Sequence, residues 1–178
     1  MRYFMIGKNI LAILLLVVLV LPVASVCADE AAVPAVPEIL YVVPFLNVMV
    51  PDTVSGHLFD SFIDQLMAAG EQHDMDIRIL KQDIDTVDKE WLAKQHFITG
   101  ELFGYSEKSG CCSTEIDAKA RVYLYSPGSV EPAQEIVVPG EVFFDHDVTT
   151  LVKEHGVIAD RMARELSRQL LADLISGR

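Results

Sequence analysis

The cluster Asp145-His146-Asp147 has the side chains best suited to bind a metal ion, and it stands where a predicted strand ends. Carboxylates and imidazoles are common ligands of divalent metals. However, successive residues of a strand point to opposite faces, so three consecutive side chains do not converge on one ion. A polar loop is therefore our first interpretation. A small exported metal-binding protein or enzyme that uses residues 145–147 is the alternative.

The remaining histidines do not complete a recognisable site. His57 and Asp60 lie one helical turn apart and could share a face, but no third partner accompanies them. His155 precedes Gly156 near the start of the last predicted helix, and we expect it to face solvent. The chain has no nucleophile elbow, Walker loop, zinc-protease motif or dinucleotide fingerprint. We predict no catalytic, cofactor-binding or metal-binding residues and no cofactor.

Cys111 and Cys112 are adjacent, in a predicted loop. A disulfide between neighbours is strained but sterically allowed, and an intermolecular bridge or two free thiols are the alternatives. No CxxC spacing is present, so a thioredoxin-type site or a zinc site is not indicated. We predict a disulfide between the two residues as one of three outcomes.

Residues 1–28 have the three parts of a secretory signal peptide. Arg2 and Lys8 form a positive region, residues 10–21 are apolar, and Val26-Cys27-Ala28 resembles a cleavage site. Cleavage after Ala28 would remove Cys27, whereas cleavage before Cys27 would make its thiol a lipid anchor. The first is favoured because Val26 is a poor residue before a lipidated cysteine. Residues 29–38 are rich in Ala and Pro and are predicted to form an extended tether.

The charge balance excludes one class of partner. The full chain has a net charge of −12, and removal of Arg2 and Lys8 leaves 12 basic and 26 acidic residues, so that the mature chain carries about −14. Such a surface repels phosphate backbones, and we predict no nucleic-acid binding. It also disfavours direct adhesion to anionic lipid. Membrane attachment is expected only through a lipid at Cys27.

Hydrophobic patterning predicts a single α/β domain over residues 39–178. The predicted order is β-α-β-α-β-β-β-α, a mixed sheet with helices packed mainly on one face. Ser55 is expected to cap the first helix and Gly70 to end it. Pro139-Gly140 marks a bulge, bend or edge position. The expected strands are 39–45, 76–81, 96–107, 116–125 and 135–144, the helices 55–70, 85–95 and 150–175, and the last two loops 107–115 and 126–134.

Four phrases in this order resemble the domain shared by the curli-secretion lipoprotein family (CsgG-like) and the amino-terminal domain of TolB. A penicillin-binding-protein activator lipoprotein family is similar too. The phrases are Tyr41–Phe45, His96–Leu102, Arg121–Tyr125 and Ala159–Leu174. The resemblance spans about residues 39–175. It implies an envelope protein that binds other proteins and has no catalytic residues.

We therefore predict a non-enzymatic, exported, protein-binding accessory or assembly component of a cell-envelope complex. Its expected location is the periplasm, with an outer-membrane lipoprotein anchored at Cys27 as the alternative. Its expected partners are other envelope proteins. A ring-forming homo-oligomer built through exposed sheet edges is a further alternative.

Overall fold

The elements follow the predicted order along the chain, with one additional short strand. A computed structural model describes residues 39–82 and 84–176. The predicted signal peptide (1–28), the candidate lipid anchor Cys27 and the tether (29–38) lie outside the described residues and stay predictions. The elements are β1 (Ile39–Val42), β2 (Leu46–Asn47), α2 (Asp52–His73), β3 (Asp76–Ile79), α3 (Lys89–Leu92), β4 (His96–Ser109), β5 (Ser113–Tyr125), β6 (Gln134–Asp145) and α4 (Leu151–Ser176).

A mixed β-sheet forms the centre of the domain, with the strand order β3-β1-β4-β5-β6. β1 is parallel to both β3 and β4, and the short β2 is also parallel to β4. The last three strands form an antiparallel meander. The α/β class and the mixed sheet are as predicted. The two ends of the sheet are very different, because β3 has four residues and β6 has twelve.

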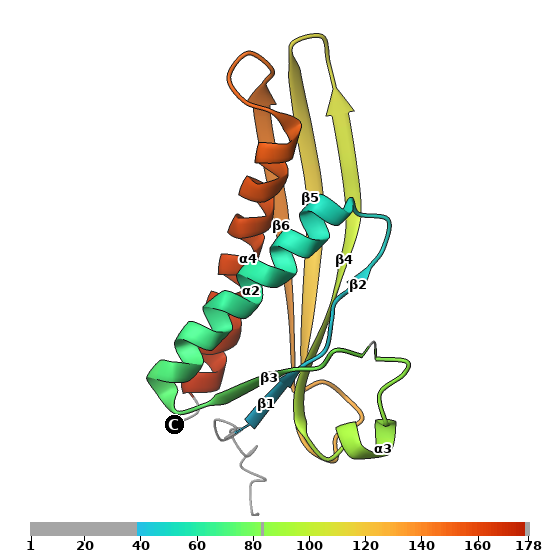
Figure 1. Cartoon of the computed structure of the whole chain (residues 1–178), viewed down its shortest axis with the longest axis vertical. Helices are drawn as coiled ribbons and strands as arrows, with labels where there is room; N and C mark the ends of the chain where they lie inside the picture. The colour runs from blue at the N-terminus through green and yellow to red at the C-terminus, as the bar shows by residue number, and fades with distance from the viewer. Residues whose placement is uncertain (1–38, 83, 177–178) are drawn as a thin grey trace, which may run out of the picture. The chain divides into compact units, whose positions relative to one another are not determined.

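The two long helices, α2 and α4, pack on one face of the sheet, as Figure 1 shows. Each presents an apolar stripe at helical spacing to the core. The largest fully buried side chains of these stripes are Leu58, Phe62 and Leu66 of α2, and Ile158, Met162, Leu166, Leu170 and Leu174 of α4. The single-turn helix α3 packs on the opposite face, where Leu92 joins Val43, Val87 and Phe97 in a small separate cluster. Helices therefore lie mainly on one face, as predicted.

Both predicted ends of α2 are wrong. The helix begins after Pro51, so Ser55 lies inside its first turn and does not cap it. At the other end the helix continues past Gly70 to His73, and Asp74, which follows it, adopts the left-handed conformation with φ 54°. Gly70 is required for a different reason. A Cβ on Gly70 would lie 2.6 Å from the main-chain oxygen of Met75, so only glycine lets α2 approach β3 this closely.

The hairpin of β4 and β5 is longer than predicted. Its strands reach Ser109 and Ser113, so the loop is residues 110–112 and not 107–115. The main-chain N–H of Gly110 donates to the oxygen of Ser113 at 2.7 Å and closes the turn. The second loop occupies residues 126–133, close to the prediction. In the part of the hairpin that the sequence did not predict, main-chain pairing and hydrogen bonds between polar side chains hold the two strands together.

Pro139-Gly140 lies in the edge strand β6, one of the three predicted positions. The pairing of β5 with β6 has no register shift there, so no bulge is present. The irregularity lies in β4, between Phe103 and Ser106, where Gly104 has a φ of 66°. That conformation favours glycine and accommodates the extra residue of a bulge.

Candidate functional site

A buried histidine joins α2, β4 and α4. His155 exposes only 5% of its surface, although the sequence predicts that it faces solvent. Its Nδ1 lies 2.8 Å from the Thr53 hydroxyl, and its Nε2 lies 2.9 Å from the Tyr105 hydroxyl. The Tyr105 hydroxyl in turn donates to Glu107 Oε2 at 3.1 Å. The solvent-facing prediction is wrong because these partners are distant in the sequence.

The hydrogen bonds of this cluster define one tautomer of His155. Because Tyr105 donates its only hydroxyl proton to Glu107, its oxygen accepts from Nε2–H of His155. Nδ1 is then unprotonated and accepts from the Thr53 hydroxyl. Burial lowers the pKa of His155, and the opposing attraction of Glu107 is smaller. Burial also raises the pKa of Tyr105 to about 12, with the hydrogen bond to Glu107 adding to the rise.

The His155 cluster has the residue types of acid–base chemistry but is closed to substrates. Both ring nitrogens are engaged, and the side chain is buried. Its geometry instead fixes the position of the first turns of α2 and α4 against β4. A neutral imidazole that bridges two hydroxyls is a satisfied internal contact.

His57, which the sequence places one helical turn from Asp60, contacts α4. His57 Nε2 lies 3.2 Å from Asp160 Oδ1, and the Ser61 hydroxyl donates to the same oxygen at 2.5 Å. The structure therefore joins His57 to a carboxylate 103 positions later in the sequence, which spacing along α2 does not reveal. About half of each side chain of the His57–Asp160 pair is exposed, so the pair adds little stability.

Residues 145–147 do not gather their three side chains around one point. His146 Nε2 lies 2.8 Å from the hydroxyl of Thr114, which is itself buried and contacts Ser109. Asp145 and Asp147 are exposed. The polar-loop interpretation fits this arrangement, in which the imidazole of His146 tethers the end of β6 to β5.

Among residues 39–82 and 84–176, the group of three side chains close enough to share a cation is Glu115, Asp117 and Glu141. Lys108 already occupies this place, with Nζ 3.2 Å from both Glu115 and Asp117. The hydrogen bond from Lys108 lowers the pKa of Asp117. The group is therefore an exposed ion-pair network on the open face of the hairpin.

The thiols of Cys111 and Cys112 lie at the tip of the β4–β5 hairpin, at the top of Figure 1. Both residues are exposed, and their Sγ atoms are 3.1 Å apart. The hydrogen bond between the two thiols raises the pKa of the Cys112 thiol, and Asp145 adds to the rise.

The half of β6 that follows Pro139, residues 140–145, offers an unpaired strand edge. No described strand pairs with its outer side. Pro139 has no N–H to donate to β5, and its strand pairs regularly with β5. The main-chain groups of residue 139 therefore point away from β5. In a strand, every second residue faces the same way, so Glu141, Phe143 and Asp145 also direct their main-chain groups outward. The donation from His146 N–H to the oxygen of Cys112 confirms this alternation.

A surface hollow of about 560 Å³ adjoins this edge, between β6 and the start of α4. Two exposed apolar side chains line it, because Phe143 is 66% exposed and Val148 is 80% exposed. Phe143 and Val148 line the hollow together with Glu141, Asp145, Lys153 and Arg161. We name this surface, comprising the outward edge of residues 141–145 and the hollow, the β6 edge site.

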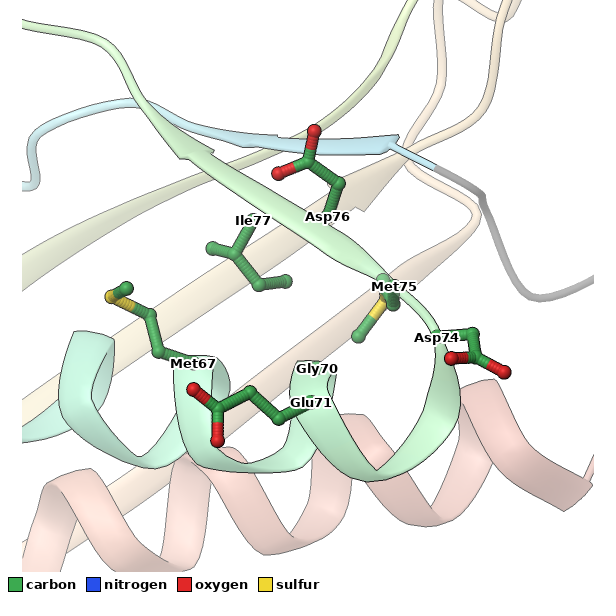
Figure 2. Close-up of a pocket in the computed structure, with 7 residues that line it drawn as sticks. All are labelled: Met67, Gly70, Glu71, Asp74, Met75, Asp76 and Ile77. Atoms are coloured by element: carbon green, nitrogen blue, oxygen red, sulfur yellow. The ribbon is translucent and has the colours of Figure 1, made fainter.

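A second hollow, of about 430 Å³, lies at the opposite edge of the sheet. Figure 2 shows Met67 of α2 and Ile77 of β3 between the helix and the strand, whereas Asp76 points away from the helix. Asp76 pairs with Arg78 on the same strand at 2.7 Å. Because β3 has only four residues, it offers a much shorter edge than β6.

The predicted site residues thus become three separate features: the tethered loop at residues 145–147, the exposed thiols of Cys111 and Cys112, and the buried His155. The β6 edge site was not predicted. The signal that could have found it is Phe143, which alternation in the strand places opposite the buried Val142 and Phe144. In the part of the chain that the structure describes, no helix has the length and apolarity to cross a membrane.

No sequence-family model and no curated protein sequence matches this chain. Solved structures do match its fold. A neuraminyllactose-binding hemagglutinin homolog from Helicobacter pylori has a TM-score of 0.54 at 8% identity, over 83% of this chain and 91% of that one. The hypothetical protein CT253 from Chlamydia trachomatis has a TM-score of 0.52 at 10% identity, over 78% and 98%.

Weaker matches include PelC from Paraburkholderia phytofirmans, described as a dodecamer. Its TM-score is 0.49 at 17% identity, over 75% of this chain and 91% of that one. Bacterial lipoproteins are among the other matched structures, also with TM-scores below 0.5. The two matches with TM-scores above 0.5 establish the α/β fold of the chain.

Proposed function

We propose that this protein is an exported, non-enzymatic binding component of the bacterial cell envelope, and that the β6 edge site holds its protein partner. The predicted signal peptide at residues 1–28 supports export. The closed His155 cluster supports a binding role over catalysis, since the histidine with the most elaborate hydrogen bonding has no access to a substrate.

The observation that carries the proposal is the unpaired edge of residues 141–145 beside exposed Phe143. An extended peptide can add to such an edge through main-chain hydrogen bonds, while neighbouring side chains provide specificity. Edge strands are commonly protected by proline, and Pro139 protects only the middle of β6. The half of β6 that follows Pro139 is the half that adjoins the hollow.

The charge of β6 defines the chemistry of the partner. Residues 134–145 carry Glu135, Glu141 and Asp145 and no basic side chain, whereas the basic residues that line the hollow, Lys153 and Arg161, belong to α4. On the open face, these acids alternate with the exposed Val137 and Phe143. We therefore propose an extended segment of another envelope protein, with apolar and basic side chains, as the occupant.

Site-specific photo-cross-linking in the native envelope tests this function. A photo-reactive phenylalanine analogue in place of Phe143 is expected to cross-link to one defined segment of another protein. The same analogue in place of Val130, a more exposed residue in the loop before β6, is the control and should not form this product.

A proline substitution distinguishes strand addition from nonspecific hydrophobic contact. Glu141→Pro removes one outward N–H, so the cross-link should fall about fivefold, since a main-chain hydrogen bond is worth about 1 kcal/mol net. Val137→Pro, the same change on the other side of Pro139, should leave it unchanged. A cross-link yield that Glu141→Pro leaves unchanged would contradict strand addition. A product containing only this chain would favour the homo-oligomer instead.

A further inference from the structure

The structure brings two thiols together at an exposed position and holds them there. The Sγ atoms of Cys111 and Cys112 are 3.1 Å apart. A disulfide bond is about 2.05 Å long, so the two sulfurs need to approach by only about 1 Å. Both residues are exposed, so a soluble oxidant reaches either sulfur. They are the two cysteines that the described part of the chain contains.

The backbone around the thiols is fixed from both sides. On one side, the turn is closed by the bond from Gly110 N–H to the oxygen of Ser113 at 2.7 Å. On the other, the oxygen of Cys112 accepts from the main-chain N–H of His146 at 2.8 Å, which ties the tip to the end of β6. The imidazole of His146 adds a contact to Thr114. The two cysteines therefore lie on a backbone that hydrogen bonds hold in place on both sides.

We propose that Cys111 and Cys112 form a dithiol–disulfide site, which an external disulfide of the glutathione or oxidoreductase class oxidises. One thiolate attacks the external disulfide, forms a mixed disulfide and releases one thiol. The second thiolate then attacks the protein sulfur of that bond and releases the other thiol. The chain loses two hydrogens and gains one S–S bond, and the oxidant is reduced to two thiols. This inference does not depend on the proposed function.

Oxidation would change the chemistry of the tip as well as its covalent structure. The reduced tip presents two S–H groups, whereas the disulfide closes a small ring through the peptide bond between Cys111 and Cys112. The ring presents an apolar surface without S–H donors and restricts the turn. Ser113 pairs with Asp145, so this change occurs beside the upper end of the β6 edge site.

Intact mass after treatment of the mature, natively folded protein with oxidised glutathione tests the site. The wild type should lose the mass of two hydrogens and keep no glutathione. Trypsin cleaves after Lys108 and Lys119, so one peptide, residues 109–119, carries both cysteines and should contain the internal bond. Dithiothreitol should restore its original mass.

Cys111→Ser and Cys112→Ser are the matched controls. Each retains one exposed thiol and should keep one glutathione on the 109–119 peptide, because no neighbour is present to displace it. Three results for the wild type would overturn the proposal. They are a retained glutathione adduct, a disulfide that joins two chains through this peptide, and a protein that stays reduced while the variants react.

Discussion

At the scale of single residues, His155 has the most demanding environment in the domain. It satisfies both ring nitrogens with hydroxyls from two other elements, and it is buried. The groups that face it are Thr53 of α2 and Tyr105 and Glu107 of β4. A protonated ring would place a positive charge in this buried position, and burial lowers the pKa of His155. The neutral ring is therefore the form that the fold stabilises.

The stability of the protein should depend on this histidine in acid. Burial lowers the pKa of His155 from 6.5, so below about pH 6.5 the unfolded chain binds this proton more readily than the folded chain. The free energy of unfolding should therefore fall as the pH drops from about 7.5 to about 5. Urea denaturation at several pH values measures this slope, and His155→Gln should make it shallower.

His96 provides an internal comparison, because burial lowers its pKa as well. The slope of the His155→Gln variant should therefore decrease without reaching zero, and His96→Gln should remove a separate part. At about pH 8, His155→Gln should still cost about 1–3 kcal/mol, since the Thr53 and Tyr105 hydroxyls lose a buried partner. An unchanged slope in His155→Gln would show that His155 is not held neutral by the fold.

At the scale of elements, close contact between α4 and β6 depends on a glycine. A Cβ on Gly140 would lie 2.4 Å from Met162 Sδ and 2.9 Å from Ile158 Cγ1. Both partner residues are buried in the stripe of α4, so they have little room to move. This contact fixes α4 against the edge strand and thereby forms one wall of the β6 edge site.

Two glycine-to-alanine variants test this packing with opposite expected signs. Gly140→Ala should lower the free energy of unfolding by about 1–3 kcal/mol, the usual cost of overpacking a core. Gly56→Ala is the matched control, because Gly56 lies in α2 with open space around its Cβ position. It should raise stability by about 0.5–1 kcal/mol through helix propensity. Equal effects of the two variants in urea denaturation would contradict close packing at Gly140.

The sequence predicts the elements because most of them bury one face, and it fails where burial is not the cause. The alternation of Ile116 to Tyr125 and the stripe from Ile158 to Leu174 are visible as patterns. The extension of β4 and β5 to the cysteines is not, since polar residues such as Lys108 and Glu115 pair there in solvent. The burial of His155 depends on Thr53 and Tyr105, which only the folded chain brings near.

At the scale of the whole molecule, the excess of acidic residues is expected to influence which partners the protein attracts. The mature chain is predicted to carry about −14. A basic segment would therefore be attracted to it over distances of about a Debye length, roughly 8 Å at physiological salt. Binding at the β6 edge site should accordingly weaken as salt rises.

Membrane attachment is predicted only through a lipid at Cys27, and the intact mass of the mature protein tests whether that lipid is present. Cleavage after Ala28 should give a mature protein that begins at Asp29 and carries no lipid. Val26→Ala improves the residue before Cys27, and it should raise the lipidated fraction in the membrane. A native protein that begins at Cys27 and carries acyl chains would contradict cleavage after Ala28 and establish the lipoprotein alternative.

The position of α4 in the sequence has a consequence for how the domain is made. A ribosome releases residues 39–109 first, yet the partner that covers the apolar stripe of α2 is the final helix, which ends at Ser176. Until those last residues emerge, Leu58, Phe62 and Leu66 have no α4 to pack against. The hydrophobic core between α2 and α4 can therefore form only after α4 has been synthesised.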